Sequence, residues 1–192
     1  MKKIGWGAEA TIFLENNRIF KKRFKKNYRI EEIDSVLRKN RTKTEAKILE
    51  KIPVKAPKLL KTDKKEIIEM EFIKGEKIRD ILDEKPFLCE KIGIGVAIMH
   101  NSRIIHGDLT TSNMIMKDEI FFIDFGLSFF SEKIEDKAVD IHLFKQALDS
   151  KHYLISEDAF KLFLKGYSKV NNYELIINRL KMVESRGRYK KK

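Results

Sequence analysis

One motif in the second half of the chain limits the fold more than any other feature. The stretch HGDLTTSNMI, residues 106–115, is followed by an apolar run and then by DFG, residues 124–126. It sets an acid at Asp108, an amide at Asn113 and a second acid at Asp124. Carboxylate and amide oxygens are hard ligands of the kind that Mg²⁺ takes. Asp, Asn and Gly are also common turn residues, so the motif must be weighed against a plain turn.

The order of the elements around this motif favours chemistry over turns. An apolar helical pattern and the short run RIIHG lead to Asp108, and the apolar run EIFFIDF leads into Asp124. H-x-D-(x)4-N, an apolar strand and D-F-G in this order are typical of phosphoryl transfer. We expect Asp108 to orient an acceptor hydroxyl, and Asn113 and Asp124 to hold Mg²⁺ against the phosphates of ATP. We expect His106 to fix the loop by packing and hydrogen bonding, not to bind the metal.

The first third of the chain carries the parts that such a site needs around its phosphates. GWGAEA lies between two strand-like segments, and its small residues let the backbone approach phosphates closely. We expect this loop to bind ATP through six residues: Gly5, Trp6, Gly7, Ala8, Glu9 and Ala10. A lysine at the α- and β-phosphates needs an acidic partner, and Lys21 and Glu45 would fill these two catalytic roles. Alone, each signal is weak, because small residues often make only a hairpin turn.

The periodicity of apolar residues predicts strands and one helix in this first third. Two strands should flank a turn at Asn16-Asn17, a common hairpin signal. The segment IIEMEF, residues 67–72, alternates as a strand does. A helix is expected over residues 33–51, before two prolines, with an apolar face made of Ile33, Val36, Leu37, Ile48 and Leu49.

From residue 87 onward the pattern becomes helical. Leu88, Ile92, Val96 and Met99 recur every three to four residues, which predicts a buried helix. Three further helices are expected over residues 139–148, 157–167 and 173–183. The fold class is therefore α+β, with three expected parts: a small β-rich lobe over residues 1–73, a larger helical lobe over residues 74–184, and a basic tail over residues 185–192.

The charge distribution indicates anionic partners. The formal net charge of the 192 residues is +12. Residues 18–47 carry 12 Lys and Arg against 4 Asp and Glu, and residues 185–192 add five basic residues and no acidic one. Such patches attract nucleic acid and acidic protein surfaces, or they form a solvated lysine-rich face.

The same composition indicates a cytoplasmic protein without a membrane partner. Cys89 is the single cysteine, so no internal disulfide can form, which fits a reducing compartment. The N-terminal residues lack the apolar core of a signal peptide. The most apolar run, residues 92–99, is far too short to span a bilayer.

Together these motifs resemble the protein-kinase-like superfamily. The resemblance implies a minimal bilobal kinase-like fold, with ATP and Mg²⁺ as cofactors. By analogy with the kinase hinge, the backbone of Glu71 and Ile73 would also hold ATP.

The chain departs from that superfamily in ways that change the expected function. Gly107 stands where H-R-D has Arg, Thr110 where the loop usually has Lys, and Ala10 where the third loop glycine would be. Only 13 residues separate Gly126 from Asp140, and no A-P-E follows. The platform that grips an extended peptide is thus largely missing, which favours water or a tethered hydroxyl as the acceptor. Asp140 could orient the catalytic loop or be an ordinary acid near a helix N-terminus.

Eight segments carry a narrower similarity: GAEATIF, KKRFKKNYR, RTKTEAKIL, MEFIKG, HGDLTTSNMI, DFGLS, EDKAVD and SRGRYKKK. They cover nearly the whole chain and resemble the small atypical kinase/ATPase subunit of the KEOPS (EKC) complex. In that family the Lys-x-Arg pattern points to Lys21 as the phosphate lysine. Lys22 is the rival, because strand alternation would aim it at the opposite face.

The narrower resemblance implies partners and a pathway. Members bind a TsaD-type threonylcarbamoyl transferase and other KEOPS subunits, which together make N6-threonylcarbamoyladenosine at position 37 of tRNAs that read ANN codons. The subunit acts mainly as an ATPase, with autophosphorylation and Ser/Thr phosphorylation also known in the family. The tail would contact tRNA or the partner through five basic residues: Arg186, Arg188, Lys190, Lys191 and Lys192.

Three other hypotheses about the function stay open. One is a free-standing atypical Ser/Thr protein kinase resembling the RIO kinases, whose loop also has H-G-D. A second is a small-molecule phosphotransferase, which DFG, the short segment after it and the basic tail disfavour. A third is a tRNA-binding scaffold without activity, which the full set of site residues disfavours.

Overall fold

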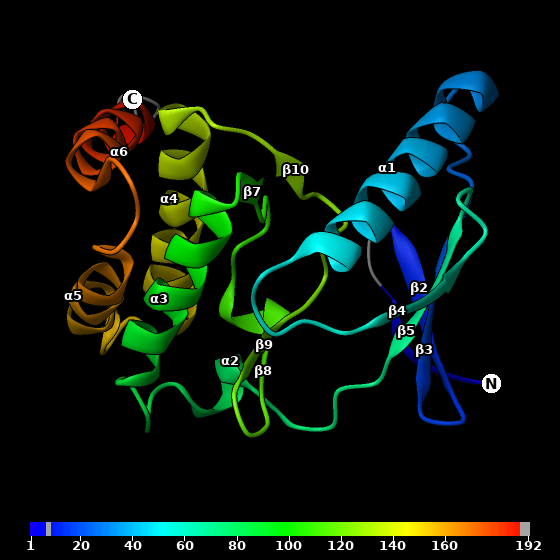
Figure 1. Cartoon of the computed structure of the whole chain (residues 1–192), viewed down its shortest axis with the longest axis horizontal. Coiled ribbons are helices and arrows are strands. Elements are labelled where there is room, and N and C mark those ends of the chain that lie inside the picture. The colour runs from blue at the N-terminus through cyan, green and yellow to red at the C-terminus, as the bar shows by residue number, and fades with distance from the viewer. Residues whose placement is uncertain (7–8, 189–192) are drawn as a thin grey trace.

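A computed structural model describes residues 1–6 and 9–188 of the chain. The long strands gather at one side of the molecule with helix α1 (Glu31–Lys51), and the helices from α3 (Leu88–Asn101) to α6 (Tyr173–Arg188) form the other side (Figure 1). Short strands lie between the two parts (Figure 1). The α+β, kinase-like architecture with a β-sheet lobe and a helical lobe is thus confirmed. The division at residue 73 stays a prediction.

The N-terminal sheet has five antiparallel strands in the order β1-β2-β3-β5-β4. Their bounds are β1 Lys2–Trp6, β2 Ala10–Glu15, β3 Arg18–Arg23, β4 Leu59–Thr62 and β5 Ile67–Glu71. The predicted hairpin joins β2 and β3, and both Asn16 and Asn17 have positive φ angles, of 48° and 60°. Two consecutive residues with positive φ match the twist of a tight hairpin, and Asn tolerates that conformation. The predicted strand over residues 67–72 is β5, with Ile68 and Met70 buried.

Helix α1, Glu31–Lys51, is the helix predicted over residues 33–51. Its predicted apolar face is correct only near its C-terminal end, where Ile48 and Leu49 are buried. The expectation is wrong for Ile33 and Val36, which are 54% and 56% exposed. The helix extends past the edge of the sheet there, so these side chains have no sheet to pack against (Figure 1). The buried residues of α1 include a polar group instead: Asp34, Thr42 and Glu45.

The helical lobe follows a short connection. Its helices are α2 Ile78–Ile81, α3 Leu88–Asn101, α4 Ile134–Lys151, α5 Ser156–Tyr167 and α6 Tyr173–Arg188. Its short strands are β6 Glu76–Lys77, β7 Ile104–Ile105, β8 Met114–Met116, β9 Ile120–Phe122 and β10 Phe129–Phe130, with a 3-10 turn at Thr111–Asn113. The predicted helix over residues 139–148 begins five residues earlier, at Ile134.

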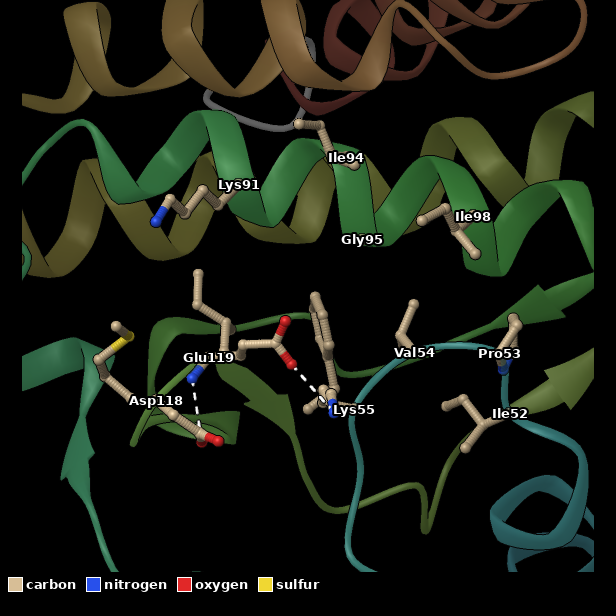
Figure 2. Close-up of a pocket in the computed structure, with 13 residues that line it drawn as sticks. Ile52, Pro53, Val54, Lys55, Lys91, Ile94, Gly95, Ile98, Asp118 and Glu119 are labelled. Carbon is tan, nitrogen blue, oxygen red and sulfur yellow. Dashed lines mark hydrogen bonds and ion pairs between the residues drawn. The ribbon is translucent and has the colours of Figure 1, made fainter.

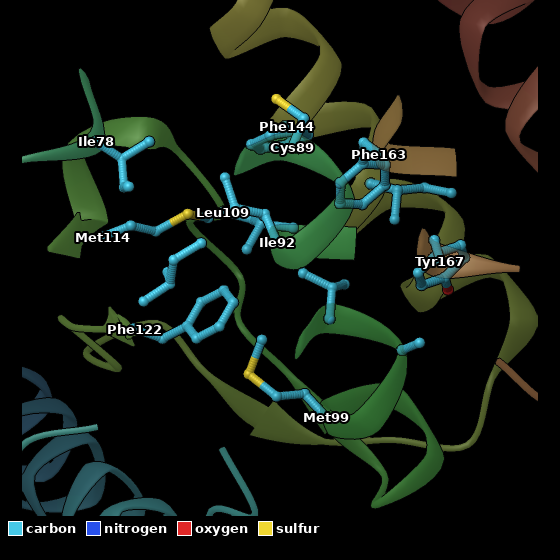
Figure 3. Close-up of a cluster of buried hydrophobic side chains, with 14 of the residues drawn as sticks. Ile78, Cys89, Ile92, Met99, Leu109, Met114, Phe122, Phe144, Phe163 and Tyr167 are labelled. Carbon is cyan, nitrogen blue, oxygen red and sulfur yellow. The ribbon is translucent and has the colours of Figure 1, made fainter. Parts of the chain in front are cut away.

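The core of the helical lobe centres on α3 (Figure 3). Leu88, Ile92, Val96 and Met99 are all buried, as their spacing predicts. The glycine in their midst, Gly93, lets α3 and α5 approach closely, because a Cβ there would overlap the Phe163 carbonyl oxygen. This packing fixes the lobe that carries the catalytic-loop motif.

The core also contains the single cysteine and a group of aromatic rings. The Phe163 ring lies 4.6 Å from the Phe144 ring and 5.6 Å from the Tyr167 ring, between ring centroids. Burial raises the pKa of the Cys89 thiol to about 12, so this thiol is unreactive at neutral pH.

Candidate active site

A cavity of about 410 Å³ lies between the sheet and the catalytic loop. Its wall gathers residues from the glycine-rich loop, from β3, from the catalytic loop and from DFG: Gly5, Glu9, Ala10, Ile12, Lys21, Arg23, Asp108, Asp124, Gly126 and Leu127. These residues are up to 122 positions apart in the sequence (5 to 127), so only the tertiary fold brings them together. The cavity thus joins both halves of the predicted site.

Lys21 is the central cation of this cavity. Its Nζ donates to Glu45 Oε1 and to Asp124 Oδ1, both at 2.6 Å. β3 directs Lys21 inward, and the next residue along the strand, Lys22, is exposed. The geometry therefore favours Lys21 over Lys22 as the phosphate lysine.

The charges of this group stabilise one another. Burial alone would lower the pKa of Lys21, but the carboxylates of Glu45 and Asp124 raise it above its ordinary value. Burial would likewise raise the pKa of Asp124, but Lys21 outweighs it and holds that pKa below its usual range. At neutral pH the site therefore holds a full positive charge facing an ionised carboxylate.

Asp108 and Asn113 lie together on the catalytic loop. Asn113 Nδ2 donates to the Asp108 carbonyl oxygen at 2.9 Å and to Asp108 Oδ2 at 2.8 Å. Since its amide nitrogen is occupied in this way, the amide oxygen of Asn113 is the atom left for a cation. Asp124 uses Oδ1 for Lys21, and its side chain is 50% exposed.

These oxygen atoms fit Mg²⁺. Within residues 1–6 and 9–188 no cluster of three or more His, Cys, Asp or Glu side chains could enclose a metal. Mg²⁺ does not need such a cage, because it usually takes one or two carboxylates together with waters and substrate phosphates. Asn113 and Asp124 are therefore the candidate ligands, one amide and one carboxylate.

Asp140 holds the catalytic loop in place by hydrogen bonds to its backbone. It is 1% exposed and accepts hydrogen bonds from the backbone amides of His106 and Gly107, each at 2.9 Å. His100 Nε2 lies 3.0 Å from Asp140 Oδ2, the oxygen that also accepts from the His106 amide. Burial alone would raise the pKa of Asp140, but the hydrogen bond from His100 and the nearby imidazoles lower it. Of the two interpretations left open for Asp140, the structure supports the one in which it orients the loop.

His106 joins the catalytic loop to the strand before DFG. Its Nε2 lies 3.2 Å from the Ile123 carbonyl oxygen, and its Nδ1 accepts from the Asp108 backbone amide at 3.4 Å. This pattern is that of a neutral ring that carries its proton on Nε2. Burial lowers the pKa of His106, which keeps the ring neutral near pH 7. The prediction that His106 fixes the loop agrees with these contacts.

Gly107 stands where the H-R-D motif has Arg, and the backbone conformation there favours glycine. Its φ is +77°, a left-handed conformation that favours glycine. A Cβ at this position would overlap the carbonyl oxygen of Leu127. The segment after DFG therefore passes directly over Gly107 and leaves no room for a side chain.

A second histidine supports the other end of the same loop. The buried His152 ring lies 3.1 Å from Thr111 Oγ1 through Nε2 and 2.7 Å from Asp83 Oδ1 through Nδ1. These three residues come from the 3-10 turn, from the start of the helical lobe and from the end of α4. No local sequence pattern joins these three residues, so the contact was not predictable from the sequence.

The glycine-rich loop is only partly described. Gly7 and Ala8 lie outside the described residues, as does the side chain of Trp6. Glu9 ties the loop to the rest of the N-terminal lobe, since its carboxylate lies 3.1 Å from Arg29 and 2.6 Å from Arg41.

The predicted hinge residues lie apart from this cavity. Glu71 ends β5 and Ile73 is buried just beyond it, and neither lines the cavity. The backbone amide of Glu71 donates to the Lys58 carbonyl oxygen at 3.0 Å. Their role in holding ATP stays a prediction.

Four residues of the cavity wall were not among the predicted site residues: Ile12, Gly126, Leu127 and Arg23. The only cation among these four is Arg23. It lies two positions after Lys21 on the same face of β3, is 1% exposed, and donates to Glu45 Oε2 at 2.6 Å. Strand alternation was the signal that could have found it.

The basic cluster over residues 18–47 is more paired than its net charge suggests. Arg38 contacts both Asp34 and Glu66, and Arg29 and Arg41 contact Glu9. The exposed cations that remain are mainly lysines. In the tail, Arg186 pairs with Glu135 at 2.6 Å, whereas the side chain of Arg188 and all of Lys190, Lys191 and Lys192 lie outside the described residues.

A larger cavity of about 560 Å³ lies elsewhere, between α3 and the segment before β4 (Figure 2). It is lined largely by apolar side chains, with a Lys55–Glu119 ion pair at its edge. None of the predicted site residues lines it, so size alone would have misplaced the site. Among the described helices, none has the length and apolar character needed to cross a membrane.

Comparison with known proteins identifies the family. The RIO domain family matches residues 11–138, which include most of β2, together with β3, α1, the catalytic loop and DFG. The KEOPS complex subunit Bud32 of Pyrococcus abyssi is 40% identical, over 100% of this chain and 98% of its own length. The chain belongs to the Bud32 family of RIO-domain, protein-kinase-like proteins.

Other Bud32 relatives extend this result. The EKC/KEOPS complex subunit BUD32 of Enterocytozoon bieneusi is 44% identical over 95% of this chain and 96% of its own length. A probable bifunctional tRNA threonylcarbamoyladenosine biosynthesis protein of Methanococcus vannielii is 40% identical over 97% of this chain, but the match spans only 36% of that protein. The chain is thus a member of a kinase/ATPase family, and the similarity stated from the motifs is confirmed.

Proposed function

We propose that this chain is a Mg²⁺-ATP-dependent atypical kinase that acts mainly as an ATPase within a KEOPS complex. The observation that carries this proposal is the meeting of Lys21 with both Glu45 and Asp124 at one wall of a cavity whose other wall presents Asp108. Phosphoryl transfer relies mostly on positioning and electrostatics, and these are the groups that it uses.

Each residue has a role that follows from its contacts. Bound Mg²⁺-ATP would supply the phosphoryl group and neutralise part of its charge. Lys21, oriented by Glu45, binds the α- and β-phosphate oxygens. The amide oxygen of Asn113 and the carboxylate of Asp124 would hold the metal, and the backbone of the glycine-rich loop with Glu71 and Ile73 would hold the nucleotide.

Asp108 positions the acceptor. One of its carboxylate oxygens is fixed by Asn113 Nδ2, so the other can accept a hydrogen bond from a hydroxyl or a water. His106 and Asp140 keep the loop in place through their hydrogen bonds. Asp108 is therefore held in one orientation before the substrate arrives.

The acceptor that suits this site best is water or a tethered hydroxyl. Only residues 127–133 lie between DFG and the start of α4 at Ile134. Within that segment β10 pairs with β7, at Phe129 with Ile105 and Phe130 with Ile104. A segment this short and this firmly paired offers little surface to a diffusing peptide.

The names of the relatives support the proposed partners. Bud32 relatives matched over their whole length carry the name of the KEOPS complex, and larger relatives carry that of tRNA threonylcarbamoyladenosine biosynthesis. We place this chain beside a TsaD-type threonylcarbamoyl transferase, supporting modification of adenosine 37 in tRNAs that read ANN codons, in the cytoplasm. The basic residues of the tail, from Arg186 to Lys192, would contact tRNA or the transferase.

A free-standing atypical Ser/Thr protein kinase is the second candidate, since the RIO domain match favours it. The two are separated by measuring ATP turnover by the purified chain alone, with the transferase, and with the transferase plus tRNA. We expect stimulation that needs both additions. Efficient phosphorylation of an added protein, with no response to transferase or tRNA, would select the second candidate.

A further inference from the structure

Arg23 occupies a place in the cavity that the proposed roles leave unexplained. In the β2–β3 ladder, Lys21 pairs with Ile12 and Arg23 pairs with Ala10. Ala10 is the first residue of β2, directly after the glycine-rich loop. Arg23 therefore lies on the loop side of Lys21, in the direction in which the phosphate chain would extend.

The guanidinium of Arg23 has donors that nothing in the described chain uses. Its Nη2 donates to Glu45 Oε2, but Nε and Nη1 are buried and have no hydrogen-bond partner within residues 1–6 and 9–188. Buried donors without a partner are rare in folded proteins, and each needs an acceptor. Arginine stays charged when buried, so it cannot relieve the cost by losing a proton.

The cavity beside Arg23 can supply such an acceptor. Arg23 lines it together with Lys21 and Asp124. A Cβ placed on Gly126 would lie 3.1 Å from Lys21 Nζ and 3.3 Å from Arg23 Nη2, so both cations border the same small space. A guanidinium repels a metal ion, whereas its fork of donors matches the oxygens of a phosphate.

We propose that Arg23 binds the terminal phosphate of the nucleoside triphosphate and distinguishes ATP from ADP. This inference rests on the proposed function. Lys21 takes the inner phosphates, and Arg23, nearer the glycine-rich loop, takes the outer one. Its charge replaces that of the catalytic-loop lysine, a position that Thr110 occupies in this chain.

The test is the ratio of two affinities. Calorimetry with Mg²⁺ would measure the binding of ADP and of a non-hydrolysable ATP analogue to the wild type, Arg23→Gln and Arg23→Lys. We expect Arg23→Gln to weaken binding of the analogue by roughly 10- to 100-fold, the loss of hydrogen bonds to a charged group, while ADP affinity changes less than about fivefold. Arg23→Lys keeps the charge without the fork and should give an intermediate loss.

Arg18→Gln is the matched control, because Arg18 lies on the same strand, is exposed and pairs with Glu69. It should leave both affinities nearly unchanged. If Arg23→Gln weakens ADP and the analogue equally, Arg23 only supports Glu45 and the inference is wrong. It is also wrong if that variant binds both ligands as tightly as the wild type does. If the wild type binds neither nucleotide, both the proposed function and this inference are wrong.

Discussion

The two sides of the cavity are held by different kinds of contact. On the sheet side, Lys21 and Arg23 share Glu45 through charged side-chain contacts of 2.6 Å. On the helical side, Asp140 holds the backbone amides of the catalytic loop. Long charged side chains can exchange one partner for a ligand, whereas a buried acid that satisfies backbone amides cannot. The difference suggests that the sheet side responds to the nucleotide and the helical side stays fixed.

Removing the support of the helical side should have the largest effect. Asp140→Ala leaves two backbone amides and a buried histidine without their acceptor, so we expect a loss of about 3–5 kcal/mol in the free energy of unfolding. Urea unfolding followed by circular dichroism measures it. Asp158→Ala, an exposed acid paired with Lys161, should cost less than about 1 kcal/mol. Equally small losses of stability in Asp140→Ala and Asp158→Ala would show that Asp140 does not hold the helical side of the cavity in place.

Removing the central cation of the sheet side should damage function and spare the fold. In Lys21→Met, Glu45 keeps Arg23 and Asp124 is half exposed, so no buried charge is left alone. We expect ATP turnover to fall by about 10²-fold or more, and the free energy of unfolding to change by less than about 1.5 kcal/mol. A large loss of stability together with normal ATP turnover would mean that Lys21 supports the fold and not the reaction.

Gly107 tests how tightly the fixed side is built. Gly107→Ala forces a Cβ onto a left-handed residue and against the Leu127 carbonyl oxygen, at a cost of about 1–3 kcal/mol. Gly5→Ala is the control, since its Cβ would lie at an ordinary 3.6 Å from Ile12. Thermal unfolding of both variants compares the two positions. A Gly107→Ala protein as stable as the wild type would show that the segment after DFG moves freely.

The smallest effect should be a pH dependence from His106. Burial lowers the pKa of this ring in the folded state, so the unfolded chain binds its proton first as the pH falls below about 6.5. The neutral His106 ring therefore makes its full contribution to the free energy of unfolding above that pH. This contribution falls as the pH drops, by at most about 1.4 kcal/mol per pH unit. Unfolding of the wild type and His106→Gln between pH 7.5 and pH 5 measures it. A slope that is unchanged in the variant would mean that His106 does not titrate in this way.

Local sequence patterns predicted the elements that local interactions dictate. The Asn16-Asn17 turn, the apolar spacing of α3 and the order of the catalytic loop and DFG were all visible in the chain. They depend on neighbours within a few residues or on a motif whose spacing is fixed by chemistry. These features were sufficient to predict the kinase-like fold and to bring Lys21, Glu45, Asp108 and Asp124 into one hypothesis.

The features that sequence reasoning missed depend on contacts between distant segments. The exposure of Ile33 and Val36 follows from the length of α1 relative to the sheet, which periodicity does not contain. Arg23, like Lys21 and unlike the exposed lysines of its cluster, is buried, because it pairs with Glu45 on α1 and lies opposite Ala10 on β2. The contact between His152 and Thr111 joins residues 41 positions apart.

The most direct test of the whole account is phosphate release from Mg²⁺-ATP by the wild type and two variants, Asp108→Ala and Asp124→Ala. Asp118→Ala, an exposed acid in the turn between β8 and β9, is the control. We expect both site variants to lose about 10²-fold or more of the turnover while keeping their circular dichroism spectra, and the control to match the wild type. Wild-type turnover in both site variants would contradict the assignment of this cavity as the active site.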